Sequence, residues 1–268
     1  MRRLINEWKT LGSARFLQVR KQKAANKIRH RYHKVVGTRA VPSRYGVLMT
    51  ANWADNTFRF CIDGAYGFDL HDLLMEYPSD FTFLDIGANQ GLYSLIACNN
   101  PHCQAVYAFE PMPDTFALLN KNILANQVQG KITAVNAAIS NTNGTATLTL
   151  DPSHTGGATL HGTENSAAKN SVVVDLIDHS TLANKIRLTG DVIVKVDVEG
   201  HEETVFSELA LTGFADQLKL IHYEVDEKWV KPEKLQRILT GLGFRQFDKF
   251  SSGRDYHYDV IARKTSAY

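Results

Sequence analysis

Residues 81–91, which read Phe-Thr-Phe-Leu-Asp-Ile-Gly-Ala-Asn-Gln-Gly, limit the fold of this chain more than any other stretch. The first half is a short apolar segment, which predicts a strand buried on both faces. Gly87 and Gly91 then bracket a tight turn, and residues 92–97 form an apolar segment of helical length. A strand, a glycine turn and a helix make the first half of a nucleotide-binding βαβ unit, in which a ligand lies across the carboxyl end of the strand.

The residues of the turn indicate which nucleotide it would bind. A dinucleotide fingerprint has the pattern G-x-G-x-x-G, whose glycines let a pyrophosphate approach the backbone. Here Asn89 replaces the second glycine, Leu92 replaces the third, and Asp85 lies inside the motif. Such a turn suits a ligand with a ribose and a charged amino-acid tail, as in S-adenosylmethionine. A second strand, residues 105–109, leads into Glu110 at the spacing where an acid accepts hydrogen bonds from both ribose hydroxyls.

A second informative run, residues 192–202, reads Val-Ile-Val-Lys-Val-Asp-Val-Glu-Gly-His-Glu. Alternation puts Lys195, Asp197 and Glu199 on one side of a strand, predicted over 191–198, that is otherwise aliphatic. Charges inside such a strand are costly unless they pair, so a structural Lys195–Asp197 pair is one interpretation. The functional interpretation places Asp197 near the methyl donor and Glu199 or His201 near the acceptor. His201 is the candidate general base, because histidine titrates near neutral pH.

Charge is unevenly distributed behind the net value of +2. Residues 1–40 carry twelve Lys and Arg against one acid, a net of +11, whereas residues 41–268 carry eighteen against twenty-seven, a net of −9. One α/β domain of ordinary size plus an extension accounts for 268 residues. We therefore expect a basic helical extension over residues 1–44 and a mildly acidic catalytic domain over residues 45–268.

The three cysteines, Cys61, Cys98 and Cys103, form neither an even set nor a CxxC pair, which favours a reducing cytoplasm. The sequence holds no apolar run of the length of a membrane span, and its beginning lacks the apolar region of a secretory signal. We expect a cytoplasmic protein that is at most peripheral on the inner face of the membrane.

The basic segment over residues 1–40 has an apolar stripe, because Leu4, Trp8 and Leu11 fall at i, i+4 and i+7. A solvated helix packed loosely on the body is the simplest interpretation. A helix that binds an anionic membrane surface, or a partner enzyme such as a glycosyltransferase, is the second. No recognisable nucleic-acid module accompanies the charge, so we expect no nucleic-acid partner.

The remaining segments predict further elements. The first are a hairpin of strands 45–51 and 57–63 around the turn 54–56, a helix over 68–77 closed by Pro78, and a helix opened by residues 111–113. Next come a third strand over 132–139, a hairpin with Asn143-Gly144 at its turn and 146–150 as its return, and a long loop over 151–170. The last are a strand over 172–176, a helix over 202–211, a strand over 218–225, a helix over 233–242, and two closing strands near 244–247 and 257–263.

Four runs together carry a family resemblance: residues 84–91, 109–111, 136–140 and 195–202. With these runs, the chain resembles the FkbM family of S-adenosylmethionine-dependent methyltransferases over roughly residues 45–264. The pattern K-[IVF]-D-[VI]-E-G-x-E is its most specific part. The resemblance implies a Rossmann-like class I methyltransferase fold of the α/β class, with a seven-stranded, mostly parallel sheet covered by helices on both faces. It also implies O-methylation of sugar hydroxyls in polysaccharides, glycolipids or natural products.

The resemblance implies roles for residues by their position. The turn would line the methionine part of the cofactor, Glu110 the ribose and residues 136–138 the adenine edge. The full implied cofactor set is Asp85, Gly87, Ala88, Asn89, Gly91, Glu110, Asn136, Ala137, Ala138 and Asp197.

Two alternative functions stay open. In a metal-assisted O-methyltransferase of a small natural product, Asp197, Glu224 and Asp226 at neighbouring strand ends would bind Mg²⁺ and lower the pKa of the acceptor. Mg²⁺ is possible but is not the favoured choice. The other alternative is a non-catalytic scaffold that binds S-adenosylmethionine and uses its basic segment for partners. The acids kept at both strand ends argue against a scaffold.

Overall fold

The computed structural model describes residues 2–150, 158–159 and 171–264, and the chain divides into two units, residues 1–41 and 42–268. The first unit consists mainly of the predicted basic helix, α1 (Arg2–Val36). This helix ends at Gly37, whose left-handed φ of 67° suits a helix terminus, and the Thr38 N–H donates to the His33 carbonyl there.

The second unit is built on a seven-stranded sheet with the order β12-β13-β11-β10-β3-β4-β5. Five strands run parallel: β3 (Phe81–Ile86), β4 (Cys103–Phe109), β5 (Ile132–Val135), β10 (Asp191–Val196) and β11 (Leu218–Asp226). β13 (His257–Arg263) is antiparallel to both β11 and β12 (Gln246–Arg254). The predicted class I methyltransferase sheet is confirmed. After β5 the chain returns to the other side of β3, so the strand order reverses between β3 and β10, where open α/β sheets bind ligands.

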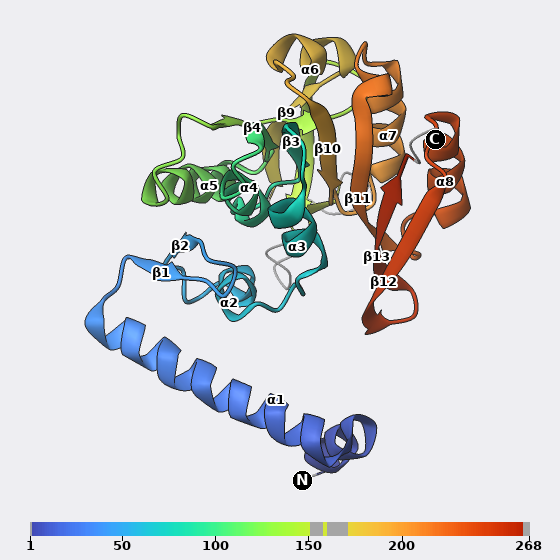
Figure 1. The fold of residues 1–268 in the computed structure, drawn as a ribbon. Helices are drawn as coiled ribbons and strands as arrows, with labels where there is room; N and C mark the ends of the chain where they lie inside the picture. The colour runs from blue at the N-terminus through green and yellow to red at the C-terminus, as the bar shows by residue number, and fades with distance from the viewer. Residues whose placement is uncertain (1, 151–157, 160–170, 265–268) are drawn as a thin grey trace. The chain divides into compact units, whose positions relative to one another are not determined.

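Helices cover both faces of this sheet (Figure 1). The helices are α3 (Asp69–Glu76), α4 (Leu92–Cys98), α5 (Pro113–Ala125), α6 (His179–Lys185), α7 (Glu202–Leu211) and α8 (Pro232–Gly241), with the 3-10 turn η1 (Ala215–Gln217). α3 packs on α4, whereas α7 packs on α6 and α8. Every residue of β3 is buried, as the apolar run predicts. The aromatic rings of Phe206 and Tyr223 meet edge to face at 5.2 Å and fill the core under α7.

The predicted N-terminal hairpin is wrong in its strands. A two-stranded sheet does precede the main sheet, but it is formed by β1 (Ala40–Pro42) and β2 (Leu48–Thr50), and residues 57–63 belong to helix α2 (Asn56–Asp63). Asp55 caps this helix by accepting a hydrogen bond from the Thr57 N–H at 2.8 Å. Its buried residues follow helical spacing rather than alternation: Phe58, Cys61 and Ile62.

The predicted third strand breaks after Val135, and its last two residues join a second sheet. This sheet has the order β6-β9-β7-β8 and consists of β6 (Ala138–Ile139), β7 (Gly144–Leu150), β8 (Ala158–Thr159) and β9 (Ser171–Ile177). The predicted hairpin of β6 and β7 is wrong, because β9 lies between them, parallel to β6 and antiparallel to β7. β9 offers β7 a ladder of six residue pairs, which the two residues of β6 cannot match. Asn143 instead accepts a hydrogen bond from the Asp178 N–H beside α6. Apart from β8, the predicted loop 151–170 lies outside the described residues.

Candidate active site

The glycine turn after β3 passes directly over the end of β10. Gly87 has a left-handed φ of 75°, and a Cβ atom there would lie 1.8 Å from the Asp197 carbonyl oxygen. Gly91 has a φ of 83°, and a Cβ atom there would lie 2.3 Å from Leu119 of α5. Asn89 is also left-handed, with a φ of 50°, a conformation that asparagine tolerates. The close packing of the chain therefore requires both glycines, and their contact with a ligand stays a prediction.

Asp85 of β3 fixes the start of α4. Its carboxylate accepts hydrogen bonds from the hydroxyl and the backbone N–H of Ser94 at 2.6 and 3.1 Å, and the Lys195 ammonium lies 3.6 Å away. The residue is only 1% exposed, and this burial raises the pKa of the carboxyl, with Lys195 acting in the opposite direction. Asp85 is therefore placed to hold the turn in shape. Ser94, nine residues later, was missed by sequence reasoning.

Glu110 lies beside the turn, just after β4. One carboxylate oxygen accepts the Asn89 N–H and the other accepts the Met112 N–H, both at 2.9 Å. Burial raises the pKa of Glu110 to about 7. Because each carboxylate oxygen has two lone pairs, both can accept a further hydrogen bond from a ribose hydroxyl.

Residues 136–138, the predicted adenine edge, lie next to Glu110. The Asn136 side-chain amide donates to the carbonyl oxygens of Glu110 and Pro111 at 2.7 and 2.9 Å. Ala137 is buried and Ala138 begins β6. The turn residues Ala88 and Asn89, the predicted ribose acid Glu110 and the predicted adenine edge thus lie together at one edge of the sheet, with the Ala88 N–H donating to the Phe109 carbonyl at 2.9 Å.

Lys195 joins the glycine turn to the strand end of β10. Its ammonium lies 3.2 Å from the Asp197 carboxylate and donates to the Gly87 carbonyl at 2.6 Å. The predicted Lys195–Asp197 pair is therefore present. β10 ends at Val196, two residues earlier than predicted, so Asp197 lies in the turn that follows. Its side chain stays 38% exposed, so the structural and functional interpretations of Asp197 are compatible.

Three carboxylates meet at the ends of β10 and β11. Oxygens of Asp197, Glu199 and Glu224 all lie within 4.8 Å of one another. Burial first, and then the negative charge of Asp197, raise the pKa of Glu199 to about 7 and that of Glu224 to about 10. Within the described chain Asp226 lies outside this group; its carboxylate instead accepts the Lys228 N–H at 2.9 Å. The third carboxylate of the group is therefore Glu199, where the sequence had suggested Asp226.

The loop that carries Glu199 has a strained backbone, and hydrogen bonds to Glu202 hold it in place. Glu199 has a left-handed φ of 50°, which is uncommon for a residue that is neither glycine nor asparagine and recurs at functional sites. The buried Glu202 carboxylate accepts the N–H groups of Gly200 and Val198 at 3.1 and 3.4 Å. Glu202 is thus a structural member of the motif, a role that sequence reasoning missed. His201 is half-buried at the start of α7, outside the acidic group.

A histidine from another strand, unlike His201, contacts the acidic group. His257 begins β13, and its Nε2 lies 2.6 Å from the Glu224 carboxylate. The antiparallel pairing of β13 with β11 brings His257 opposite Asp226. Asp259, two residues further on, also has its pKa raised to about 7 by burial and by Asp197. Sequence reasoning treated β13 as a closing strand and missed the His257–Glu224 pair, because no local pattern shows which strand β13 pairs with.

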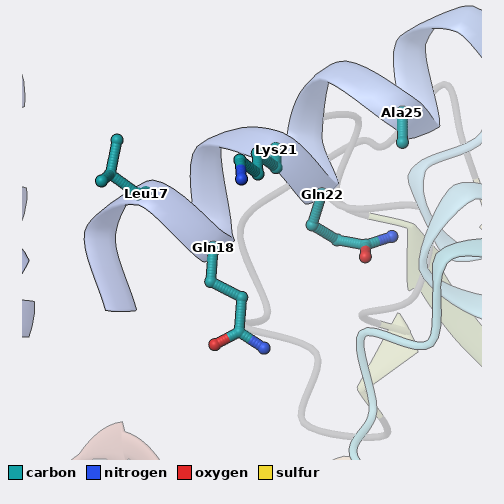
Figure 2. Close-up of a pocket in the computed structure, with 5 residues that line it drawn as sticks. All are labelled: Leu17, Gln18, Lys21, Gln22 and Ala25. Atoms are coloured by element: carbon teal, nitrogen blue, oxygen red, sulfur yellow. The ribbon is translucent and has the colours of Figure 1, made fainter. Parts of the chain in front are cut away.

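Figure 2 draws a pocket on the first unit. It is lined by residues on one face of α1: Leu17, Gln18, Lys21, Gln22 and Ala25. None of the candidate site residues contributes to it.

Two solved structures are similar to this chain in fold. One is the M. jannaschii TYW2 in complex with AdoMet, with 15% identity, a TM-score of 0.46, and coverage of 83% of this chain and 85% of that one. The other is the precorrin-6y C5,15-methyltransferase of Geobacter metallireducens, with 14% identity, a TM-score of 0.41, and coverage of 73% and 86%. The fold assignment depends on the strand order above rather than on these values.

Curated relatives are similar in sequence. The hexuronic acid methyltransferase AglP of Haloferax volcanii is 28% identical over 170 residues, which are 63% of this chain and 65% of that protein. Methyltransferase sdnD of Sordaria araneosa is 32% identical over 87 residues, 32% of this chain and 34% of that protein. The chain thus spans less than two thirds of the length of these relatives. Residues 85–246, more than half of the chain, match the methyltransferase FkbM domain, and this protein therefore belongs to the FkbM methyltransferase family.

Proposed function

We propose that this protein is an S-adenosylmethionine-dependent O-methyltransferase that methylates a sugar hydroxyl in a polysaccharide, glycolipid or glycosylated natural product. Family membership supports methyl transfer, and a relative named as a hexuronic acid methyltransferase supports a sugar acceptor. One contact carries the proposal: Lys195 binds the glycine turn through the Gly87 carbonyl and the acidic strand end through Asp197. This contact holds the donor and acceptor sides in one geometry, as in-line transfer requires.

S-adenosylmethionine, when bound, supplies an electrophilic methyl group on a sulfonium. Glu110 would hold the ribose through its two oxygens, and residues 136–138 would border the adenine. Asp197 is the acid placed to attract the positively charged methionine end, because its carboxylate is exposed beside the turn. Burial of Asp85 suits a positioning role beneath it.

The acceptor hydroxyl must lose its proton as the new O–C bond forms. His201 is the base proposed from the sequence, with Glu199 beside it. The His257–Glu224 pair is a second candidate, because a carboxylate that binds one imidazole nitrogen orients the ring and stabilises its protonated form. In either case the proton leaves the hydroxyl oxygen and is held by the imidazole until release to solvent.

Turnover and cofactor affinity of histidine variants test this assignment. We expect loss of the true base to lower turnover by about 10²–10⁴-fold with little change in the affinity for S-adenosylmethionine. The variants are His201→Ala and His257→Ala. His179→Ala is the matched control, since His179 also pairs with a glutamate, Glu208, at 3.0 Å. If both test variants turn over like the control, neither histidine is the base. If S-adenosylmethionine and its demethylated product do not bind the unaltered protein, the methyltransferase proposal is wrong.

A metal-assisted mechanism is a second candidate, favoured by one observation. Asp197, Glu199 and Glu224 bring three carboxylates to the spacing of a cation site, and Mg²⁺ prefers oxygen ligands. A bound cation would lower the pKa of the acceptor hydroxyl and remove the need for histidine. We would then expect EDTA to abolish activity, added Mg²⁺ to restore it and His201→Ala to be mild. Glu199→Gln should remove the thermal shift that Mg²⁺ produces, while Asp226→Asn, the matched control, should keep it.

The basic helix α1 would hold the enzyme at an anionic membrane surface if the acceptor is lipid-linked. The side chains of the predicted stripe, Leu4, Trp8 and Leu11, lie outside the described ones. Three later apolar residues of the helix are strongly exposed: Ile28 at 72%, Tyr32 at 61% and Val35 at 79%. Within the described chain, no helix is long and apolar enough to cross a bilayer. Basic residues near an anionic surface contribute about 1 kcal/mol each.

Co-sedimentation with anionic and neutral vesicles tests the role of α1. We expect the full chain to bind anionic vesicles, with binding that falls steeply as salt rises. Ile28→Glu with Val35→Glu should weaken it. Leu124→Glu is the control, because Leu124 is 62% exposed but belongs to the other unit. Equal binding by all variants would contradict a membrane role and favour a partner enzyme such as a glycosyltransferase.

A further inference from the structure

Trp229 is an exposed aromatic residue at the acceptor side that the mechanism above does not use. It lies in the turn after β11, where its backbone N–H donates to the Asp226 carbonyl at 2.9 Å. Its side chain is 53% exposed. A tryptophan that only filled the core would be buried, so half of its surface is available for another contact.

The turn that holds Trp229 is fitted to the catalytic motif. A Cβ atom on Gly200 would lie 3.1 Å from the Trp229 Cβ, and Gly200 has a left-handed φ of 99°. Trp229 therefore stands directly against the loop between Glu199 and His201. This contact gives a reason for glycine in the motif that does not involve the cofactor.

A second exposed aromatic residue lies on the neighbouring turn. Tyr256, 38% exposed, precedes His257, and its carbonyl accepts the Glu227 N–H at 2.9 Å. The Lys228 ammonium lies 4.4 Å from the centre of the Tyr256 ring. The turns after β11 and before β13 are thus joined, and aromatic surface and carboxylates occur at the same edge of the sheet.

We propose that Trp229 is the stacking surface for the sugar ring of the acceptor, with Glu199 and Glu224 accepting hydrogen bonds from its hydroxyls. A pyranose has an apolar C–H face and a rim of hydroxyl donors. The C–H face suits the electron-rich face of an indole, and the hydroxyls suit the carboxylate group next to it. This inference rests on the proposed function and deepens it: it selects a sugar ring over the hydroxyl of an open chain and names the residue that selects it.

Steady-state kinetics provide the first test, with methyl glycosides of a neutral hexose, an amino sugar and a hexuronic acid as acceptors. We expect Trp229→Ala to raise the KM for the best glycoside about tenfold, with kcat and S-adenosylmethionine affinity little changed, because a stacked ring contributes ground-state binding. Trp229→Phe should restore part of the loss. Trp53→Phe is the matched control, since the Trp53 ring packs edge to face on Phe58 at 5.1 Å. A Trp229→Ala variant with unchanged KM would overturn the inference.

Fluorescence provides a test that does not need turnover. The sequence has three tryptophans, so Trp8→Phe with Trp53→Phe leaves Trp229 as the one emitter. With S-adenosylhomocysteine bound, we expect a glycoside to shift the emission of Trp229 and a straight-chain alcohol to leave it unchanged. No shift with any glycoside, or an equal shift with the alcohol, would overturn the stacking role while S-adenosylhomocysteine binding still supports a methyltransferase. Failure of S-adenosylhomocysteine to bind would overturn the proposed function itself.

Discussion

The proposed donor side and the proposed acceptor side of this site are both rich in carboxylates, but the two sides differ in which groups hold those carboxylates. On the donor side, Glu110 accepts two backbone N–H groups and Asp85 accepts two hydrogen bonds from Ser94. On the acceptor side, oxygens of Glu199 and Glu224 lie within 4.8 Å of each other and of Asp197, which borders the donor side. Backbone and hydroxyl donors therefore hold the donor-side carboxylates, whereas the acceptor-side carboxylates lie against one another and against His257.

This difference indicates which task each side suits. Carboxylates fixed by backbone donors form a rigid frame, which suits a cofactor that binds the same way in every cycle. Burial and then the charge of Asp197 raise the pKa of Glu199 to about 7, so this carboxyl exchanges protons near neutral pH, which suits the proposed acceptor chemistry. Lys195 contacts both sides, so it couples them.

The largest expected effect comes from removing this coupling. Lys195 is 4% exposed, and Lys195→Met would leave Asp85 buried without its ion pair. We expect the free energy of unfolding to fall by about 3–5 kcal/mol in urea titrations. Lys234→Ala is the control: Lys234 and Glu203 form an exposed pair, whose loss should cost about 0–1 kcal/mol. Similar losses for both variants would show that Lys195 does not join the two sides.

The next effect separates the two sides by ligand. Glu110→Ala should weaken S-adenosylmethionine binding by about 1.5–3 kcal/mol, because it removes hydrogen bonds to a charged group. Glu199→Gln, on the acceptor side, should leave that affinity nearly unchanged. Isothermal titration would measure both. Thermal shifts should appear with S-adenosylmethionine and its demethylated product but not with NAD⁺, because Asn89 stands where a dinucleotide fold needs glycine. An NAD⁺ shift of equal size would refute the cofactor assignment.

The smallest effect concerns pH. The folded protein holds protons on Glu199 and Asp259, whose pKa values are raised to about 7, while the unfolded chain releases them near pH 4–4.5. The folded state binds more protons in this window, so stability of the ligand-free protein should fall as pH rises from about 5 to about 7. The midpoint temperature of unfolding should therefore fall with rising pH over this range. In the double variant Glu199→Gln with Asp259→Asn, this fall should be smaller by roughly a few degrees.

Two controls accompany the pH series. Glu110→Gln should remove a smaller share of the slope, because it removes one titrating carboxyl rather than two. Asp178→Asn should lower the whole curve without changing the slope above pH 5, because hydrogen bonds from Thr181 and Ser180 lower the pKa of Asp178 to about 2. A slope that stays as steep in the acceptor-side double variant as in the unaltered protein would place the titrating groups elsewhere.

Local signals in the sequence explain both the correct and the wrong elements. The apolar run of β3 and the spacing to Glu110 predict a βαβ unit because they fix neighbouring residues. Residues 57–63 alternate in hydrophobicity at Phe58, Phe60 and Ile62, which favours a strand, but the Asp55 cap starts a helix instead. A short alternating run fits both periods, and the cap decides between them.

The sequence by itself determined the glycine turn and the Lys195–Asp197 pair, because each depends on residues close together in one strand and the turn after it. It also predicted Glu110 as the acid that would bind the ribose. The tertiary structure alone decided the acceptor side. Glu199, Glu224 and His257 come from three distant segments, and they meet because β11 lies between β10 and β13 in the sheet. The contact of Gly200 with Trp229 has the same origin. Side-chain periodicity specifies which face of a strand is buried, but not which strand becomes its neighbour, and that choice built this half of the site.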